Sequence, residues 1–376
     1  MENVIELIID ENNEISGIEA ISIVENPAIE EDFIALKEHK EVRQNIGIFD
    51  MSSFGKIRVE GGGALNFLQE ICTAQINIQI GKIVYTQMLN EKGGIESDLT
   101  ISRLGEKSFL LVVPCATLQR DLSYLKRKNN SKEVMIIDIS SSEGVLSIMG
   151  PNSRKLLECV SPNNFSNSAH PFGTWKNIEI GSGLARAHRV SYVGELGWEI
   201  YISSDQCAHV FEEIWKLQKE MQFNLCGIHA LDSCRIEKAY RHFGHDITDE
   251  DHIVDAGLSF TADLSKKNFE GKESILNKRK IGSSKKMLQF KLNDPSKMIY
   301  HNEPVLRNNK IVGYLTSGNF GHTLGGCIGL GYVDSKNLSN EEILSFDYSI
   351  DVAGEIVTAE ASLKPMYDPK SERVRM

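Results

Sequence analysis

The sequence has few of the features that mark secreted, membrane-spanning or nucleic-acid-binding proteins. Its 7 cysteines lie far apart and form no Cys-x-x-Cys pair, which argues against a disulfide framework and favours reduced thiols. No apolar run approaches the ~20 residues that a membrane-spanning helix needs, since the longest covers only 109–113. Positive charge is scarce too. The 41 Lys and Arg are set against 52 Asp and Glu, and the net charge of -11 disfavours nucleic-acid binding.

The amino terminus carries acidic residues where a secretory signal peptide would carry Lys or Arg, so we expect a cytoplasmic protein. With only 9 prolines, 41% hydrophobic residues and 25% charged residues, the composition is that of an ordinary globular protein. A chain of 376 residues exceeds the size of one simple core, which predicts two or three domains.

Residues 1–37 differ in pattern from the rest of the chain. Apolar and polar residues alternate on both sides of an Asp-Glu-Asn-Asn turn, which predicts a β-hairpin. Asn26-Pro27 then breaks the pattern, and an acidic stretch follows. We interpret 1–37 as an appended segment.

From Glu38 onward the pattern is that of a mixed α/β enzyme. The predicted strands cover 54–59, 85–89, 95–104, 109–113, 134–139, 145–149, 185–192 and 197–202. The predicted helices cover about 64–72, 117–128, a segment opened by Gly150-Pro151, 205–221 and 228–242. Beyond residue 283, five short strand-like runs separated by turn residues predict a small antiparallel barrel or sandwich.

The hairpin YTQMLNEKGGIESDLTISRL places Asp98 among polar residues. In its second strand, Ile95, Leu99 and Ile101 mark the core face, so Asp98 and its neighbours at 96 and 100 lie on the opposite face. Spacing alone favours a solvated face, because aspartate is usually exposed.

The hairpin RVSYVGELGWEIYI crowds Tyr192, Glu195, Trp198 and Glu199 around a short turn. A carboxylate beside aromatic rings can bind a flat heterocycle by accepting paired N–H donors. Cross-strand aromatic packing with exposed glutamates is the commoner outcome for such a composition.

Two further segments carry charged residues. On the helix GIHALDSCRIEKAYRHFG, Arg235 lies three residues after Asp232, a spacing typical of surface ion pairs, although its planar donor fork could also hold a ligand carboxylate. The segment HFGHDITDEDH gathers three histidines and three aspartates, but Gly244 separates His242 from His245 and no second ligand set follows, so we expect no metal site. The glycines at 61–63 lack a dinucleotide or phosphate-loop pattern.

Together these motifs resemble the glycine-cleavage T-protein (aminomethyltransferase) superfamily, most closely the folate-binding C-terminal half of dimethylglycine and sarcosine dehydrogenases. The similarity runs in order from about residue 38 to 376. Besides the segments quoted above, EHKEVRQNIGIFDMSSFGKIRVEG, DAGLSFTADLSKKNFEGKE, GYLTSGNFGHTLGGCIGLGYV and YDPKSERVRM carry it.

The resemblance implies an α+β fold of three domains in a ring around a channel that holds tetrahydrofolate. It implies two interleaved α/β folate-binding subdomains over 38–283 and a C-terminal antiparallel β-barrel over 284–376. It also implies roles for single residues. Asp98 lies near the folate nitrogens as the catalytic carboxylate, Tyr85 lines the same site, Tyr192 and Glu199 contact the pterin, and Arg235 holds the folate.

The resemblance further implies that an N-methyl amine, such as dimethylglycine or sarcosine, delivers a methylene unit as an iminium or as formaldehyde, and that 5,10-methylenetetrahydrofolate results. An ionised Asp98 would stabilise the iminium and accept a proton from a folate nitrogen. Since the sequence carries no dinucleotide fingerprint, we expect a separate flavin dehydrogenase to oxidise the amine.

Two departures distinguish the chain from many glycine-cleavage T-proteins. Leu231 stands where those proteins often have an arginine, and Asp255 replaces a glutamate. Three alternatives remain: direct aminomethyl transfer as in glycine cleavage, sulfonium demethylation, and a non-catalytic folate-binding assembly factor. The identity of the one-carbon donor separates the first two from the leading hypothesis. The third would be expected to carry a reactive cysteine motif, and none is evident.

Overall fold

The computed structural model describes residues 4–9, 15–21 and 27–376, with side chains from residue 34 onward. Strand β1 (Val4–Ile9) pairs in antiparallel with β2 (Ile15–Ile21), which confirms the predicted hairpin, although its predicted turn lies outside the described residues. Helix α1 (Pro27–Gln44) begins at the predicted break and crosses residue 37. The division of the chain at residue 37 stays a prediction.

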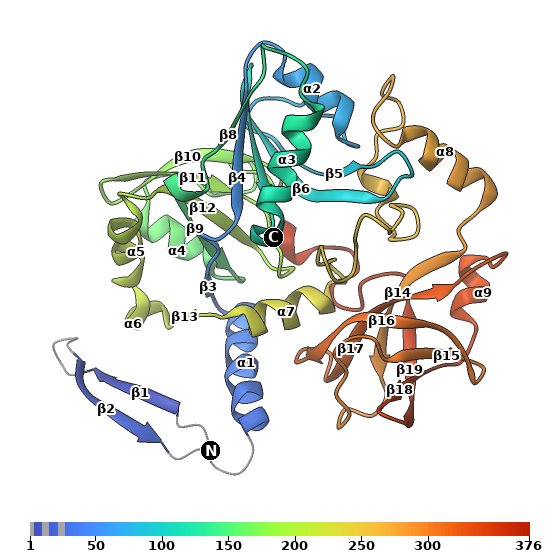
Figure 1. The fold of residues 1–376 in the computed structure, drawn as a ribbon. Helices are drawn as coiled ribbons and strands as arrows, with labels where there is room; N and C mark the ends of the chain where they lie inside the picture. Colours follow the sequence, from blue (N-terminus) through green and yellow to red (C-terminus); the bar gives the residue numbers. More distant parts are fainter. Residues whose placement is uncertain (1–3, 10–14, 22–26) are drawn as a thin grey trace.

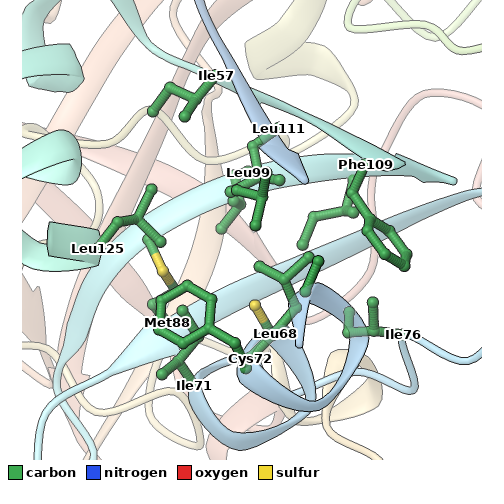
Figure 2. Close-up of a cluster of buried hydrophobic side chains, with 14 of the residues drawn as sticks. Ile57, Leu68, Ile71, Cys72, Ile76, Met88, Leu99, Phe109, Leu111 and Leu125 are labelled. Atoms are coloured by element: carbon green, nitrogen blue, oxygen red, sulfur yellow. The ribbon is translucent and has the colours of Figure 1, made fainter. Parts of the chain in front are cut away.

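A five-stranded antiparallel sheet with the order β5-β6-β7-β4-β8 forms the upper part of the molecule (Figure 1). Its strands are β4 (Gly55–Glu60), β5 (Ile83–Leu89), β6 (Ile95–Gly105), β7 (Ser108–Val113) and β8 (Met135–Asp138). Helices α2 (Ala64–Ile71) and α3 (Leu118–Lys128) cover one face. Figure 2 shows the apolar core between them, where Leu99 and Leu111 of the sheet meet Leu68 of α2.

A six-stranded sheet with the order β10-β11-β12-β9-β3-β13 forms the second part. Its strands are β3 (Gly47–Asp50), β9 (Glu143–Met149), β10 (Trp175–Ile180), β11 (Gly183–His188), β12 (Gly197–Ser203) and β13 (Asn224–Leu225). Helices α4 (Ser153–Val160), α5 (Cys207–Trp215) and α6 (Gln218–Met221) accompany it. Because β4 to β8 all lie between β3 and β9 in the sequence, the two sheets are interleaved along the chain.

The third part is a closed antiparallel barrel with the order β14-β17-β16-β15-β18-β19. Its strands are β14 (Lys285–Leu292), β15 (Pro304–Arg307), β16 (Lys310–Gly321), β17 (Gly326–Asp334), β18 (Tyr348–Val352) and β19 (Glu355–Ser362). Helix α7 (Ile228–Glu237) contacts β16 and β17, α8 (Lys272–Ile281) precedes the barrel, and α9 (Asn340–Leu344) lies within it in sequence. The α+β, three-part prediction with a C-terminal barrel is therefore confirmed.

The structure corrects three predicted element boundaries. The strand predicted for 185–192 ends at His188, the helix predicted for 205–221 divides into α5 and α6, and α7 ends at Glu237 and not near residue 242. Helix α7 ends early because a residue other than glycine adopts the left-handed conformation that terminates it. Ala239 adopts φ 52°, and the N–H of Tyr240 donates to the carbonyl of Arg235, as in a Schellman motif.

A buried ion network centred on Arg43 of α1 joins the helix to distant segments. Its guanidinium lies 3.1 Å from Glu195 and 2.9 Å from Glu237, and it stacks 4.0 Å from the ring centre of Tyr367. Burial alone would raise the Glu237 pKa, but the hydrogen bonds and charges of His39 and Arg43 lower it to about 2. The network thus holds α1, α7 and the C-terminal residues together.

Among the helices in the described part of the chain, none is both long enough and apolar enough to cross a membrane.

Candidate functional site

The polar face of β6 is turned toward the six-stranded sheet. Ser102 is fully buried, and its hydroxyl lies 3.4 Å from the imidazole Nδ1 of His188 on β11. Beside it, Val112 of β7 packs in one apolar cluster with Tyr201 of β12. Spacing alone favours solvent for this face, but Ser102 is buried, and Asp98 and its neighbours at 96 and 100 are only partly exposed. A second sheet covers it, so Asp98 lies at the junction of two domains.

The turn before β6 is fixed by close packing. Gly93 has a φ of 81°, and a side-chain carbon on Gly94 would lie 1.9 Å from the carbonyl oxygen of Asp249. The amide of Ile95 donates to the carbonyls of Thr248 and Asp251. The predicted NEKGG turn therefore needs glycine where the hairpin meets the segment after α7.

Asp98 is held by the neighbouring strand of its own hairpin. Gln87, directly opposite in register, donates from Nε2 to the carboxylate Oδ1 at 2.7 Å. Burial raises the Asp98 pKa to about 6, while hydrogen bonds from Gln87 and Tyr85 and the charge of Arg241 act in the opposite direction. A carboxylate with a pKa near neutral can both carry charge and accept a proton at physiological pH.

Two aromatic pairs lie close to this carboxylate. Tyr85 contacts Phe260, whose side chain is 75% exposed, at 6.5 Å between ring centres. Tyr192 stacks on Tyr240 at 6.0 Å, and its hydroxyl donates to the carbonyl of Arg241 at 2.9 Å. Burial raises the Tyr192 pKa, and the charge of Asp98 adds to this effect. The structure thus brings Tyr85, Asp98 and Tyr192 within electrostatic reach of one another.

Glu199 lies on the face of β12 that is turned toward the first sheet. It is 8% exposed, it accepts a hydrogen bond of 2.8 Å from the Tyr201 hydroxyl, and it is the cross-strand partner of His188. Burial raises the Glu199 pKa to about 7. Within the described residues only Oε2 receives a hydrogen bond, so Oε1 remains available for N–H donors of a ligand.

Arg235 is 2% exposed and is largely committed to the chain itself. Its Nε donates to Asp232 at 2.6 Å and its Nη1 to Asp246 at 2.7 Å. On the barrel strand β16, the hydroxyls of Thr316 and Ser317 also donate hydrogen bonds to the carboxylate of Asp246. Arg235 therefore ties α7 to the barrel. Only its Nη2 lacks an acceptor among the described residues, so its predicted contact with folate stays a prediction.

The histidine segment after α7 shows packing contacts. The rings of His242 and His245 lie 4.7 Å apart, and Asp246 is engaged by Arg235. Over residues 4–9, 15–21 and 27–376, no group of three or more His, Cys, Asp or Glu side chains is arranged to hold a metal ion.

Three residues of the site were not predicted from the sequence. Gln87 could have been found, because the predicted hairpin places it across from Asp98. Thr261 gives no such signal, since its hydroxyl reaches Gln87 across 174 residues of sequence. Arg241 follows Glu237 by four residues, a spacing that predicts only a surface ion pair. In the structure its guanidinium donates to the carbonyls of Ala239 and Ala256, and its charge acts on Asp98.

Comparison with protein-family models matches two of them. The GCVT N-terminal domain covers residues 28–266, and the glycine cleavage T-protein C-terminal barrel domain covers residues 285–368. The aminomethyltransferase T of the glycine cleavage system from Bartonella henselae has a similar solved structure. The TM-score is 0.79 at 25% identity, covering 89% of this chain and 90% of that one.

Three curated relatives differ in length. The 4-methylaminobutanoate oxidase (formaldehyde-forming) of Paenarthrobacter nicotinovorans is 39% identical over 90% of this chain, which spans 41% of that protein. The mitochondrial sarcosine dehydrogenase of Homo sapiens is 33% identical, again over 90% of this chain but over only 39% of its own length. The aminomethyltransferase of Halothermothrix orenii is 34% identical over 86% of this chain and 90% of its own length.

Proposed function

Because the chain belongs to the glycine-cleavage T-protein (aminomethyltransferase) family, we propose that it transfers a methylene unit from an N-methyl amine to tetrahydrofolate and forms 5,10-methylenetetrahydrofolate. The chain is a folate-dependent one-carbon transferase of this family, as the resemblance in its motifs implies. The amine donor and the partner are proposals. The observation that carries the proposed transfer chemistry is the partly buried carboxylate of Asp98, whose pKa desolvation raises to about 6, near the junction of the two sheets.

The residues at this junction fit tetrahydrofolate. Glu199 keeps one carboxylate oxygen without a donor in a largely buried position, and such an oxygen suits the amino and ring N–H groups of a pterin. The rings of Tyr85 and Tyr192 offer flat apolar surface. The Nη2 of Arg235 offers a donor to an oxygen of the ligand.

When bound, tetrahydrofolate supplies nucleophilic amine nitrogens. We propose that Asp98, ionised at neutral pH, stabilises the positive charge of the incoming iminium. Its carboxylate then accepts the proton that leaves the folate nitrogen as the new C–N bond forms. Tyr85 and Gln87 hold the carboxylate through hydrogen bonds, and the covering sheet limits access of water to the reactive carbon.

The donor class is proposed from the curated relatives. Two of them are named for the oxidation of an N-methyl amino acid, and one of these is named as formaldehyde-forming. Oxidation of an N-methyl group to the formaldehyde level releases two electrons, which need an acceptor. We therefore propose a flavin dehydrogenase as the partner that supplies the methylene unit.

A second candidate is direct aminomethyl transfer as in glycine cleavage. The match along 90% of the aminomethyltransferase from Halothermothrix orenii favours it. The donor separates the candidates, because this reaction takes an aminomethyl group from a lipoyl carrier, and the first takes formaldehyde or an iminium.

The proposed function is tested by calorimetry with tetrahydrofolate, followed by a spectroscopic assay of 5,10-methylenetetrahydrofolate formed from formaldehyde or from aminomethyl-lipoyl carrier. We expect binding, and turnover with formaldehyde that exceeds the uncatalysed rate. Turnover with the lipoyl donor alone would support the second candidate. Absence of tetrahydrofolate binding would contradict both.

The affinity for tetrahydrofolate is expected to fall as the pH is lowered through 7. The Glu199 pKa is raised to about 7, so below this pH the carboxyl is protonated and must lose its proton before it can accept two N–H donors. The dissociation constant should therefore rise by about tenfold per pH unit below 7. Calorimetry in buffers of different ionisation enthalpy measures both the affinity and the proton released.

The variant Glu199→Gln isolates this effect. Its neutral amide lacks the charge that strengthens the hydrogen bonds to the ligand N–H groups, so we expect about 10- to 100-fold weaker binding at pH 8 and little change in affinity between pH 6 and 8. Glu179→Gln, an exposed position on β10 of the same sheet, is the matched control and should retain the wild-type profile. An unchanged affinity in Glu199→Gln would show that the pterin lies elsewhere.

A further inference from the structure

Asp98 stands at the end of a chain of three polar side chains from separate segments. Its Oδ1 receives the Gln87 Nε2 at 2.7 Å, and the Gln87 Oε1 is hydrogen-bonded to the hydroxyl of Thr261. Thr261 belongs to a single 3-10 turn (Ser259–Thr261), and its hydroxyl also lies 2.8 Å from the carbonyl of Leu258. Gln87 is fully buried and Thr261 is 6% exposed, so water contributes little to this chain of bonds.

The proton count of this chain allows two arrangements. The hydroxyl of Thr261 has one proton, but two oxygens lie within its reach, on Gln87 and on Leu258. A carboxamide can exchange the places of its oxygen and nitrogen by turning through ~180°, and the two settings have nearly the same shape. The acceptor that Thr261 serves therefore depends on how the Gln87 amide is turned.

With Asp98 ionised, the Gln87 N–H donates to the carboxylate and the Thr261 O–H donates to the Gln87 oxygen. With Asp98 protonated, its O–H donates to the Gln87 oxygen. The turned amide nitrogen then donates to Thr261, whose own proton goes to Leu258. Every contact in the chain is satisfied in both arrangements. An amide fixed in its first setting can face a protonated Asp98 only when the proton sits on Oδ2, whereas the turned amide also satisfies a proton on Oδ1, the oxygen that Gln87 contacts.

We propose that Gln87 is a positioning residue that turns its amide as Asp98 takes up and releases the proton of the reaction, with Thr261 as the reversible partner. The proposal rests on the proposed function for the source of the proton, the folate nitrogen that forms the new bond. The proton passes to an Asp98 oxygen and leaves to solvent when the site resets. No oxidant or further reactant takes part.

Other groups face Asp98, and they remain in place in both arrangements. Tyr85 of β5 donates to the carboxylate, Arg241 after α7 contributes positive charge, and Tyr192 from the loop before β12 senses the Asp98 charge. The Arg241 guanidinium is tethered to main-chain carbonyls, which cannot exchange donor and acceptor roles. The Tyr85 hydroxyl can donate or accept where it stands, and Gln87 is the neighbour whose role reverses by a turn of its amide.

The test is nuclear magnetic resonance of the full chain without any ligand, carrying carbon-13 in the aspartate carboxyls and in the threonine methyls. The Gln87 side-chain amide protons should show a cross-relaxation signal to the Thr261 methyl at pH 5. This signal should be several-fold weaker at pH 8. The pH at which half of the change has occurred should match the midpoint of the Asp98 titration. A signal that stays constant while Asp98 titrates would overturn the proposal.

The chain provides a matched control in Gln289, another buried glutamine. Its Nε2 donates to the main-chain carbonyls of Ile236 and Glu237, and its Oε1 accepts from the N–H of Met366. These partners have fixed roles, so the Gln289 amide should show no pH-dependent change. Because the measurement uses the unliganded wild-type protein, failure of the proposed function would not be mistaken for failure of this inference.

Kinetics give a second reading. Gln87→Met preserves side-chain length but removes the hydrogen bonds to Asp98, so the acid limb of the transfer rate should move up by about one pH unit while the KM for folate changes less than about twofold. Gln289→Met makes the same exchange at the buried control glutamine outside the site and should retain the wild-type limb. An unshifted limb in Gln87→Met would contradict the assigned role, since loss of general packing alone does not reproduce the shift.

Discussion

Asp98→Asn is expected to lose methylene transfer by about a thousandfold while it still binds tetrahydrofolate within about threefold of the wild-type affinity. The amide nearly preserves the shape of the carboxyl group and keeps an oxygen for the Gln87 donor. It lacks the negative charge that stabilises the iminium and cannot accept the proton of the folate nitrogen. General-base and electrostatic contributions of ~10²–10⁴-fold are both removed. Single-turnover assays with formaldehyde and calorimetry measure the two quantities separately.

The control for this variant is Asp121→Asn. Asp121 is a fully buried carboxyl whose pKa, like that of Asp98, is raised by burial to about 6, but it lies on α3 and is hydrogen-bonded to Thr117 on the other face of the five-stranded sheet. It should retain transfer activity. Equal loss in both variants would point to general damage of the sheet, and retained transfer in Asp98→Asn would contradict the catalytic role.

Asp98→Asn is also expected to stabilise the unliganded protein at alkaline pH. Folding raises the Asp98 pKa from 3.8 to about 6, so stability is lost as the pH rises from about 3.8 to about 6, and the full cost of the ionised carboxylate is present above pH 6. Asparagine removes that cost, and the gain at pH 8 should be on the order of 1–3 kcal/mol. Thermal unfolding at pH 5 and pH 8 should show a higher Tm for the variant at pH 8 and a smaller difference at pH 5.

Arg43→Met is expected to give the largest loss of stability. Glu195 and Glu237 have side chains that are 0% exposed. Removal of Arg43 leaves Glu195 with the partly exposed Arg373 and, among the described residues, Glu237 with only His39 nearby. Breaking a buried ion pair in this way costs about 3–5 kcal/mol. The Tyr367 ring would also lose the guanidinium that stacks on it. Urea unfolding measures the loss, and limited proteolysis should show earlier cleavage near the C-terminal residues.

A surface pair is the comparison for Arg43. Lys216 is paired with Glu213 at 2.7 Å, but its side chain is 65% exposed, so Lys216→Met should change stability by less than about 1 kcal/mol. The double variant Arg43→Met with Glu237→Gln should recover part of the loss, because it removes one uncompensated carboxylate. Similar losses for Lys216→Met and Arg43→Met would show that burial of the network has little energetic weight.

Local chemistry explains why some features could be predicted. The NEKGG turn fixes the register of β5 and β6, and that register places Gln87 opposite Asp98. The end of α7 could not be predicted, because Ala239 adopts a left-handed conformation that propensity assigns to glycine. Thr261 and Arg43 act through contacts between residues far apart in sequence, which periodicity does not encode.

The polar face of β6 likewise has one property that the sequence predicts and one that depends on tertiary packing. Alternation identified which side chains share a face, but the partner of that face depends on a second sheet built from distant strands. Similarly, the spacing of Arg235 and Asp232 predicted an ion pair, which the structure contains at 2.6 Å. The buried link from Arg235 to Asp246 and the barrel needed tertiary packing.

The interleaving of the two sheets has a consequence for how the chain is assembled during synthesis. The strands β4 to β8 are contiguous in sequence, so the five-stranded sheet can form as soon as residues 55–138 have left the ribosome. Strand β3 emerges earlier, but its antiparallel neighbour β9 is made only after that whole sheet. Until β9 has been synthesised, strand β3 lacks this hydrogen-bonded neighbour. The junction that carries Asp98 and Glu199 can form only after β12 has been synthesised.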